Sequence, residues 1–289
     1  MRRELFLVIC GFFILDTLIS NFLEDGLNKY YGLKTNAEIA FVGHSHLMLA
    51  IDKSRIEKKL KKKVAKYTRE GVNIVDRDLM IDQLLMLNQQ TKIVVYGVDA
   101  WMFTKEGLSS NSYKLFYPFM GSETVDDYVK SHTSFSDYWQ KYIIKSSRYN
   151  EGLISGSLRG KLNNWDNFKL GTVDTVRLKE NVSKGDYRRI NSSRENIKIF
   201  ESTIDRLVKR NIKVFLVYVP TISFYNQAEK KKFRECLNYF SEFAKTSDNI
   251  QYLEFINGWE MKHDYFFDPI HLNPLGQQSF TDSLLCYLK

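Results

Sequence analysis

The longest apolar stretch of the chain lies at its N-terminus. Residues 5–23 read LFLVICGFFILDTLISNFL, which is close to the length that crosses the hydrocarbon core of a bilayer. Arg2 and Arg3 precede it, and basic residues of this kind stay on the cytoplasmic side. No small-residue cleavage site follows it. The pattern predicts an uncleaved single-pass anchor over residues 1–23, with the N-terminus in the cytoplasm and the main domain outside.

One carboxyl group, that of Asp16, interrupts this apolar stretch. A charged group inside the hydrocarbon core is costly, so such residues face a partner or a polar cavity. Two interpretations are open. Asp16 meets a partner helix in the membrane, or it lies near the interface of a tilted helix.

Short apolar runs alternate with amphipathic stretches beyond a polar stem over residues 24–37. The predicted strands cover residues 37–42, 64–68, 92–98, 212–219 and 250–255. The predicted helices cover residues 50–63, 76–89, 195–210, 228–245 and 274–288. This alternation predicts an α/β domain over residues 38–289, with a three-layer, doubly wound parallel sheet of the flavodoxin-like kind.

The alternation is interrupted over residues 101–193, a region rich in Tyr, Trp, Ser and Asn. It lacks clean periodicity, apart from a partly helical character around residues 124–147. We interpret it as an irregular inserted cap. No internal repeat is evident.

The charge and cysteine content limit the kinds of partner and cofactor that the chain is expected to bind. The net charge is +8, which fits either solvated helix faces or a surface for anionic lipid and acidic polymers. The sequence has no nucleic-acid-binding signature and no Cys/His cluster, so we expect no nucleic-acid partner, no metal and no cofactor. Whether Cys236 and Cys286 form a disulfide is left open.

Two short motifs carry candidate chemistry. Gly43-His44-Ser45-His46 follows the first predicted strand, and Asp268-Pro269-Ile270-His271 lies between the last strand and the last helix. A serine nucleophile needs a base, and an Asp three residues before a His can orient it. Each motif alone fits an ordinary loop, and His46 suits either packing or a pocket wall. Together, after strands of one sheet, they predict a Ser45–Asp268–His271 triad.

Here the chain resembles the SGNH (GDSL-like) hydrolase superfamily. Gly43-His44-Ser45 corresponds to the nucleophile block of that family, Asp268-Pro269-Ile270-His271 to its Asp-x-x-His block, and residues 272–280 to the usual continuation. The resemblance implies an oxyanion hole at Gly71 and at Asp99, where the family has Asn. An ionised Asp99 would repel the oxyanion, and losing one such donor costs about 10²–10³ in rate. Either Asp99 is protonated, or it turns away, or the backbone N–H groups of Ser45 and Gly71 suffice, or the protein does not catalyse.

Superfamily resemblance implies ester chemistry through an acyl-enzyme. The single anchor is similar to the bacterial branch that includes alginate acetylation proteins and the protein of lipoteichoic acid D-alanylation. We therefore expect an extracytoplasmic serine acyltransferase or esterase on the bacterial cytoplasmic membrane, acting on O-acyl groups of a cell-surface polysaccharide. The aromatic insertion would bind the sugar, and a membrane-bound O-acyltransferase would be a partner. A simple membrane-anchored esterase or lipase is a second hypothesis, and a non-catalytic assembly or glycan-binding protein of a surface-polymer pathway is the third.

Overall fold

The structure is a computed structural model that describes residues 2–105 and 109–288. The chain forms two compact units. Unit 1 comprises residues 1–34 and 110–165, and unit 2 comprises residues 35–109 and 166–289.

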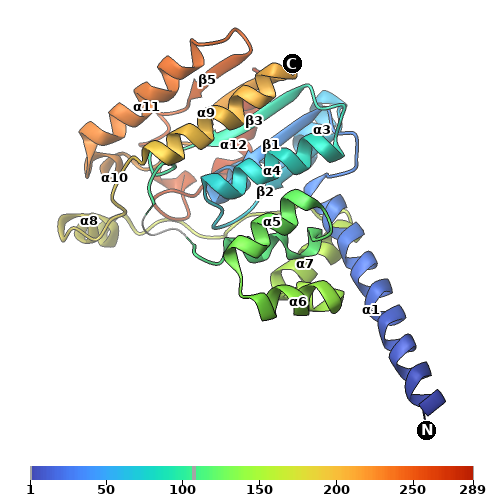
Figure 1. Ribbon diagram of the computed structural model, residues 1–289. Helices are drawn as coiled ribbons and strands as arrows, with labels where there is room; N and C mark the ends of the chain where they lie inside the picture. The colour runs from blue at the N-terminus through green and yellow to red at the C-terminus, as the bar shows by residue number, and fades with distance from the viewer. Residues whose placement is uncertain (1, 106–108, 289) are drawn as a thin grey trace. The chain divides into compact units, whose positions relative to one another are not determined.

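Unit 2 is built on a five-stranded parallel sheet. Its strands are β1 (Ile39–Gly43), β2 (Val64–Thr68), β3 (Ile93–Val98), β4 (Lys213–Tyr218) and β5 (Ile250–Glu254). They lie in the order β2-β1-β3-β4-β5, and every neighbouring pair is parallel (Figure 1). This flavodoxin-like order has its switch point between β1 and β3, and ligands bind beyond the carboxyl ends of such strands. The predicted fold class is confirmed.

The helices of unit 2 cover both faces of this sheet. They are α2 (Ser45–Ala50), α3 (Lys53–Leu60), α4 (Ile74–Leu87), α8 (Thr175–Ser183), α9 (Arg194–Lys209), α10 (Ser223–Gln227), α11 (Lys230–Ala244) and α12 (Pro274–Leu285), with a short 3₁₀ helix, η3 (His263–Tyr265). Coverage on both faces explains why the strands read as continuous apolar runs rather than as alternating ones.

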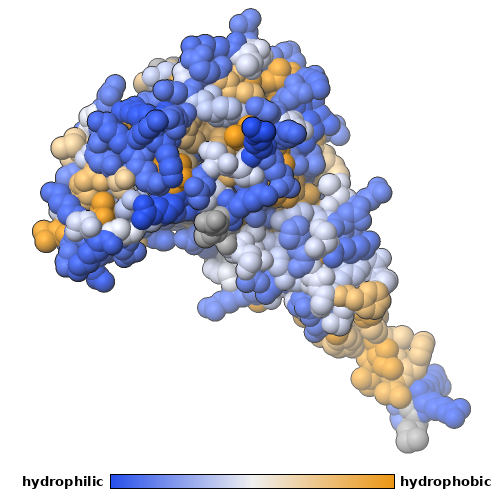
Figure 2. Space-filling model, turned by 60° about the vertical axis from the view of Figure 1, so that its left-hand side comes forward, coloured by the Kyte–Doolittle hydropathy of each residue, from blue (hydrophilic) through white to orange (hydrophobic). Residues whose placement is uncertain are grey.

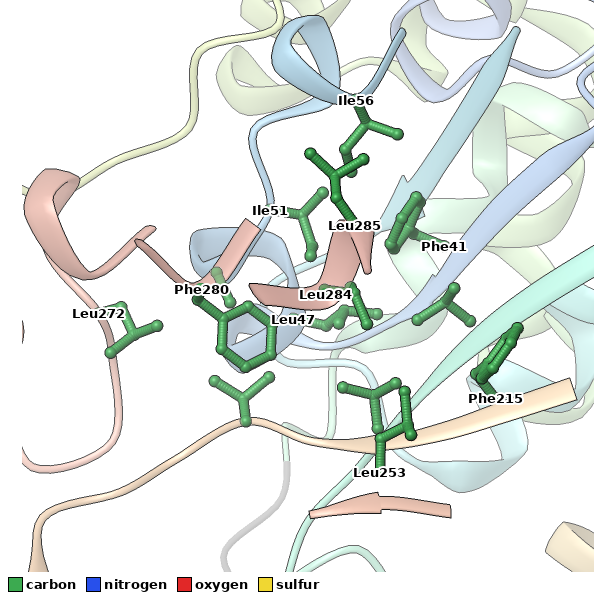
Figure 3. Close-up of a cluster of buried hydrophobic side chains, with 14 of the residues drawn as sticks. Phe41, Leu47, Ile51, Ile56, Phe215, Leu253, Leu272, Phe280, Leu284 and Leu285 are labelled. Carbon is green, nitrogen blue, oxygen red and sulfur yellow. The ribbon is translucent and has the colours of Figure 1, made fainter. Parts of the chain in front are cut away.

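A cluster of buried hydrophobic side chains lies between the sheet and α12. Phe280 and Leu284 of α12 pack in one buried cluster with Phe41 of β1 and Phe215 of β4 (Figure 3). Helices α2 and α3 contribute to the same cluster. Because this packing fixes α12 against β1, it also fixes the distance between the loops that follow β1 and precede α12.

Unit 1 is helical. It contains α1 (Arg2–Tyr31), η1 (Ser112–Phe119), α5 (Glu123–His132), α6 (Phe135–Ile143), η2 (Lys145–Arg148) and α7 (Glu151–Lys161). α1 is long and apolar enough to cross a membrane, and its apolar residues form an exposed band near the N-terminal end (Figure 2). In Figure 1, α6 and α7 lie beside the second half of α1.

Small residues let α1 and α7 approach closely. A Cβ added at Gly160 would lie 1.9 Å from the carbonyl oxygen of Gly26, and one added at Gly26 would lie 2.2 Å from Ser157 Oγ. Gly152, Gly156 and Gly160 recur every four residues along α7. This spacing is typical of helices that pack together in membranes, where small residues permit close backbone contact.

The structure differs from the predicted boundaries in two places. The stem is not separate, because α1 continues without a break to Tyr31. The predicted insertion over residues 101–193 is divided, because residues 110–165 join α1 in unit 1 and the remainder belongs to unit 2. The partly helical character predicted around residues 124–147 corresponds to α5 and α6. Helix α7 was not predicted, since it meets α1 through glycine and serine rather than through an apolar stripe. Cys236 is buried, Cys286 is exposed, and both are free thiols, so the pairing left open by the sequence is absent.

Candidate active site

Ser45 is the first residue of α2 and lies just beyond the end of β1. Its Oγ lies 2.8 Å from Nε2 of His271, and Nδ1 of His271 lies 2.7 Å from Oδ2 of Asp268. The structure therefore brings the three predicted side chains into one hydrogen-bonded chain. With the Nδ1 proton donated to Asp268, Nε2 of His271 is free to accept the Ser45 hydroxyl.

The loop that carries Asp268 holds the carboxylate in its charged form. Oδ1 accepts hydrogen bonds from the backbone N–H groups of Ile270 and His271, at 3.0 and 2.9 Å. Burial opposes ionisation, but the bonds from His271 and from the backbone outweigh it and keep the pKa of Asp268 below its usual range. The carboxylate is therefore ionised at neutral pH and can fix the tautomer of His271.

The residues after His271 explain why its loop is rigid. Asn273 caps α12 by accepting from the N–H groups of Leu275 and Gly276, and its amide donates to the carbonyl oxygens of Gly171 and Asp264. A Cβ at Gly276 would lie 2.3 Å from the carbonyl oxygen of Tyr265. Asn273 and Gly276 are thus required by the structure of this loop rather than by a reaction at the site.

Asp99 follows β3 and is buried, but it does not act as an oxyanion donor. Its Oδ2 lies 2.6 Å from Nε2 of His44 and 3.6 Å from the Arg77 guanidinium, and Oδ1 accepts from the N–H of Trp101 at 2.9 Å. Burial alone would raise the pKa of Asp99, but His44 and Arg77 lower it well below its usual range. An ionised carboxylate has no proton to donate, so the oxyanion role implied for Asp99 by resemblance is wrong.

His44 completes this arrangement as a neutral imidazole. Its Nδ1 accepts the N–H of His46 at 3.0 Å, so the ring proton lies on Nε2 and is donated to Asp99. Burial lowers the pKa of His44, and Asp99 only partly offsets that effect. Where the family has Asp before the serine and Asn after the third strand, this chain has His44 and Asp99, which bind each other.

A small cavity adjoins Ser45. Its volume is about 110 Å³, and its walls include Ser45, Gly71, Trp101 and Arg188. Gly71 lines this cavity with φ +77°, a conformation that favours glycine. Its oxyanion role stays a prediction. Within residues 2–105 and 109–288, no group of three or more His, Cys, Asp or Glu side chains could hold a metal ion.

His46 lines the same cavity and also packs. Its ring makes edge-to-face contacts with His44 and His271, with ring centroids 4.3 and 5.2 Å apart. Burial lowers the pKa of His46 well below its usual range, so the ring is neutral. Its Nδ1 has no hydrogen-bond partner among the described residues. The two interpretations of His46 that the sequence left open therefore both apply.

Arg188 is the functional candidate that sequence reasoning missed. Its backbone oxygen accepts the Trp101 indole N–H at 2.9 Å, and its backbone N–H donates to Tyr225 Oη at 3.1 Å. Its Nε is buried without a hydrogen-bond partner in the described part of the chain. The positive charge of Arg188 contributes to the lowered pKa values of His44 and His46. No motif signals this residue, because it lies in the irregular segment after α8.

No family model and no curated protein matches the sequence. Solved structures are similar in fold. A protein of Streptococcus pneumonia provisionally described as a platelet activating factor is 12% identical, with a TM-score of 0.48 and coverage of 96% of this chain and 97% of that chain. A GDSL-like lipase from Bacteroides thetaiotaomicron is 11% identical, with a TM-score of 0.42 and coverage of 93% and 97%.

Scores at this level carry no argument about activity. The sheet order, the position of Ser45 after β1, and the Asp268–His271 turn before the last helix agree with the resemblance to SGNH (GDSL-like) hydrolases. The His44–Asp99 pair departs from the pattern of that superfamily.

Replacing Asp99 by the Asn of the family should destabilise the protein. The Asp99→Asn variant leaves buried Arg77 without its counter-charge, so we expect the free energy of unfolding to fall by about 3–5 kcal/mol. Urea denaturation measures it. The double variant Asp99→Asn/Arg77→Met should recover part of the loss. An Asp99→Asn protein as stable as the parent would show that this charge pair does not hold the site.

Proposed function

We propose that this protein is a membrane-anchored serine esterase or O-acyltransferase, which acts outside the cytoplasm on O-acyl groups of a cell-surface polysaccharide. The observation that carries the catalytic part is the continuous hydrogen-bonded chain from Ser45 through His271 to Asp268 at the wall of a cavity. The apolar helix α1 supports the anchor. The polysaccharide substrate and a membrane-bound O-acyltransferase partner rest on resemblance to the surface-polymer branch.

In the proposed reaction, Ser45 Oγ attacks the ester carbonyl while His271 Nε2 takes its proton. The tetrahedral intermediate collapses, the C–O bond of the leaving alcohol breaks, and His271 protonates that alcohol. The acyl-enzyme then reacts with water, or with a glycan hydroxyl, whose proton passes to His271. The second tetrahedral intermediate collapses, the ester bond to Ser45 Oγ breaks, and His271 returns its proton to that oxygen, which restores Ser45. The transferase and esterase activities differ only in which hydroxyl group enters at this second step.

The oxyanion hole of this proposal does not use a side-chain amide. The backbone N–H groups of Ser45 and Gly71 are its expected donors, and the Arg188 guanidinium adds positive charge at the cavity wall. The Asp99 carboxylate is bound by His44, Arg77 and the Trp101 N–H. The non-catalytic alternative drew its support from Asp99, which stands where the family has its Asn donor. The proposal therefore relies on backbone donors and on Arg188 in place of that amide.

Labelling with a fluorophosphonate tests the catalytic proposal. The parent chain should be labelled, and Ser45→Ala should not be. Asp268→Asn should slow labelling and turnover by roughly 10³–10⁴, because His271 loses the carboxylate that orients it. The Ser279→Ala change, at a partly exposed position of α12, is the matched control. Labelling that persists in Ser45→Ala would contradict the proposal, and comparing acyl transfer to glycan with release to water separates the two activities.

The small cavity predicts a short acyl group. A volume of about 110 Å³ beside Ser45 accommodates a few heavy atoms rather than a fatty chain. We expect kcat/KM for p-nitrophenyl acetate to exceed that for the decanoate by roughly tenfold or more, since added methylenes find no pocket. Initial rates below KM for an acyl-length series provide the measurement. Equal or rising values along the series would show that the acyl chain lies elsewhere.

Removing the positive charge of Arg188 should slow the reaction. Arg188→Gln is expected to lower kcat/KM for a short ester by roughly 10–10², because a charge at the cavity wall no longer meets the developing oxyanion. Steady-state kinetics should show the loss mainly in kcat. Arg189→Gln is the control, since Arg189 is exposed and lies over the Tyr187 ring. Unchanged kinetics in Arg188→Gln would exclude this role.

A further inference from the structure

Helix α6 carries an apolar stripe that faces outward within unit 1. Phe135, Trp139, Tyr142 and Ile143 are spaced i, i+4, i+7 and i+8, and they are 81%, 42%, 45% and 52% exposed. Tyr138 is the buried residue of this helix. An amphipathic helix ordinarily turns such a stripe toward a core. On α6 the stripe is exposed instead, and exposed apolar patches of this kind mark sites that contact another molecule or a membrane.

Asp16 of α1 fixes the end of α6 in position. Its two carboxylate oxygens accept hydrogen bonds from the backbone N–H groups of Lys145 and Ser146, both at 2.8 Å. These residues begin η2, one residue after α6 ends. One turn farther along α1, the Tyr149 hydroxyl donates to the carbonyl oxygen of Ser20 at 2.9 Å. The junction of α6 and η2 therefore lies at the level of Asp16.

α1 still exposes apolar side chains beyond that level. Leu18, Ile19 and Phe22 are 60%, 41% and 50% exposed. At about 1.5 Å per residue, Phe22 lies roughly 9 Å farther along the helix axis than Asp16. Residues 5–22 together span about 27 Å, which is close to the thickness of the hydrocarbon core. A bilayer that covers this whole band also reaches the end of α6.

The residue types on α6 are those expected at the interface of a bilayer. Helices that lie in the membrane interface bury an apolar face by about 5–10 Å, and Trp and Tyr gather at that level. The accessible charged residues of α6 and η2 are Lys141, Lys145 and Asp137, whereas Arg148 is buried and donates to the carbonyl oxygens of Lys141 and Met120. The net positive charge favours anionic headgroups.

We propose that the outward face of α6 lies in the outer interface of the same bilayer that α1 crosses, in contact with anionic phospholipid. This inference rests on the proposed membrane anchor. It gives Asp16 a role within its own chain, as the acceptor that ties η2 to α1, in place of a partner helix. It also assigns the exposed aromatic residues of α6 to lipid rather than to sugar.

Quenching by brominated lipid tests this placement. The full chain is reconstituted in phosphatidylcholine–phosphatidylglycerol vesicles whose acyl chains are brominated near the headgroup, and tryptophan fluorescence is compared with that in unbrominated vesicles. We expect Trp139→Phe to lose most of the quenchable emission. Trp259→Phe is the control, because Trp259 packs beside Phe280 and Tyr265 in unit 2. That variant should keep the quenched component.

Two outcomes overturn the inference, and they are distinguishable. If alkaline carbonate releases the parent chain from the vesicles, the membrane anchor fails and the placement of α6 fails with it. If the chain resists extraction, yet Trp139→Phe and the parent are quenched to the same extent, the anchor stands and α6 does not face lipid. Circular dichroism and labelling of Ser45 confirm that both tryptophan variants are folded.

Discussion

The buried carboxylate of Asp99 is the constraint on which the candidate site depends. It joins the end of β3 to Arg77 of α4 and to His44 at the end of β1. Because His44 donates to Asp99 through Nε2, its Nδ1 is left to accept the N–H of His46 and so caps the first turn of α2. That turn carries Ser45. The hydrogen bond from His44 to the Asp99 carboxylate thus sets the backbone that carries Ser45, and the imidazole stays neutral although it adjoins a charged group.

The sequence predicts the α/β unit well because the physics there is local or strongly periodic. Buried strands such as β3 and β4 read as unbroken apolar runs, and Pro274 with Asn273 marks the start of α12. The side chains of the triad could also be identified, since parallel strands place the residues that follow them at one edge. The partners of Asp99 could not be identified from the sequence. Its ion pair with Arg77 and its hydrogen bond with His44 depend on the register between β1, β3 and α4, which no single segment encodes.

The same contrast between local patterns and contacts of distant segments explains why unit 1 was predicted less well. The helical period is visible in α5 and α6, but the sequence does not show that the apolar stripe of α6 stays exposed. α7 meets α1 through glycine and serine, and α6 turns its aromatic residues outward. Asp16 could be seen from the sequence only as an isolated charge. Its two acceptor bonds join residues 129 and 130 positions apart, and such pairing has no local signature.

The electrostatic field in the cavity beside Ser45 depends on which of the surrounding charged groups are paired with an opposite charge. Arg77 and Asp99 neutralise each other, and burial keeps His44 and His46 uncharged, so these four groups contribute little net field at Ser45. Asp268 is negative and lies behind His271, where it stabilises the imidazolium that forms on proton transfer. The described part of the chain offers Arg188 no ion pair. In the proposed reaction, this charge at the cavity wall would balance the oxyanion in place of the side-chain amide that the resemblance implies.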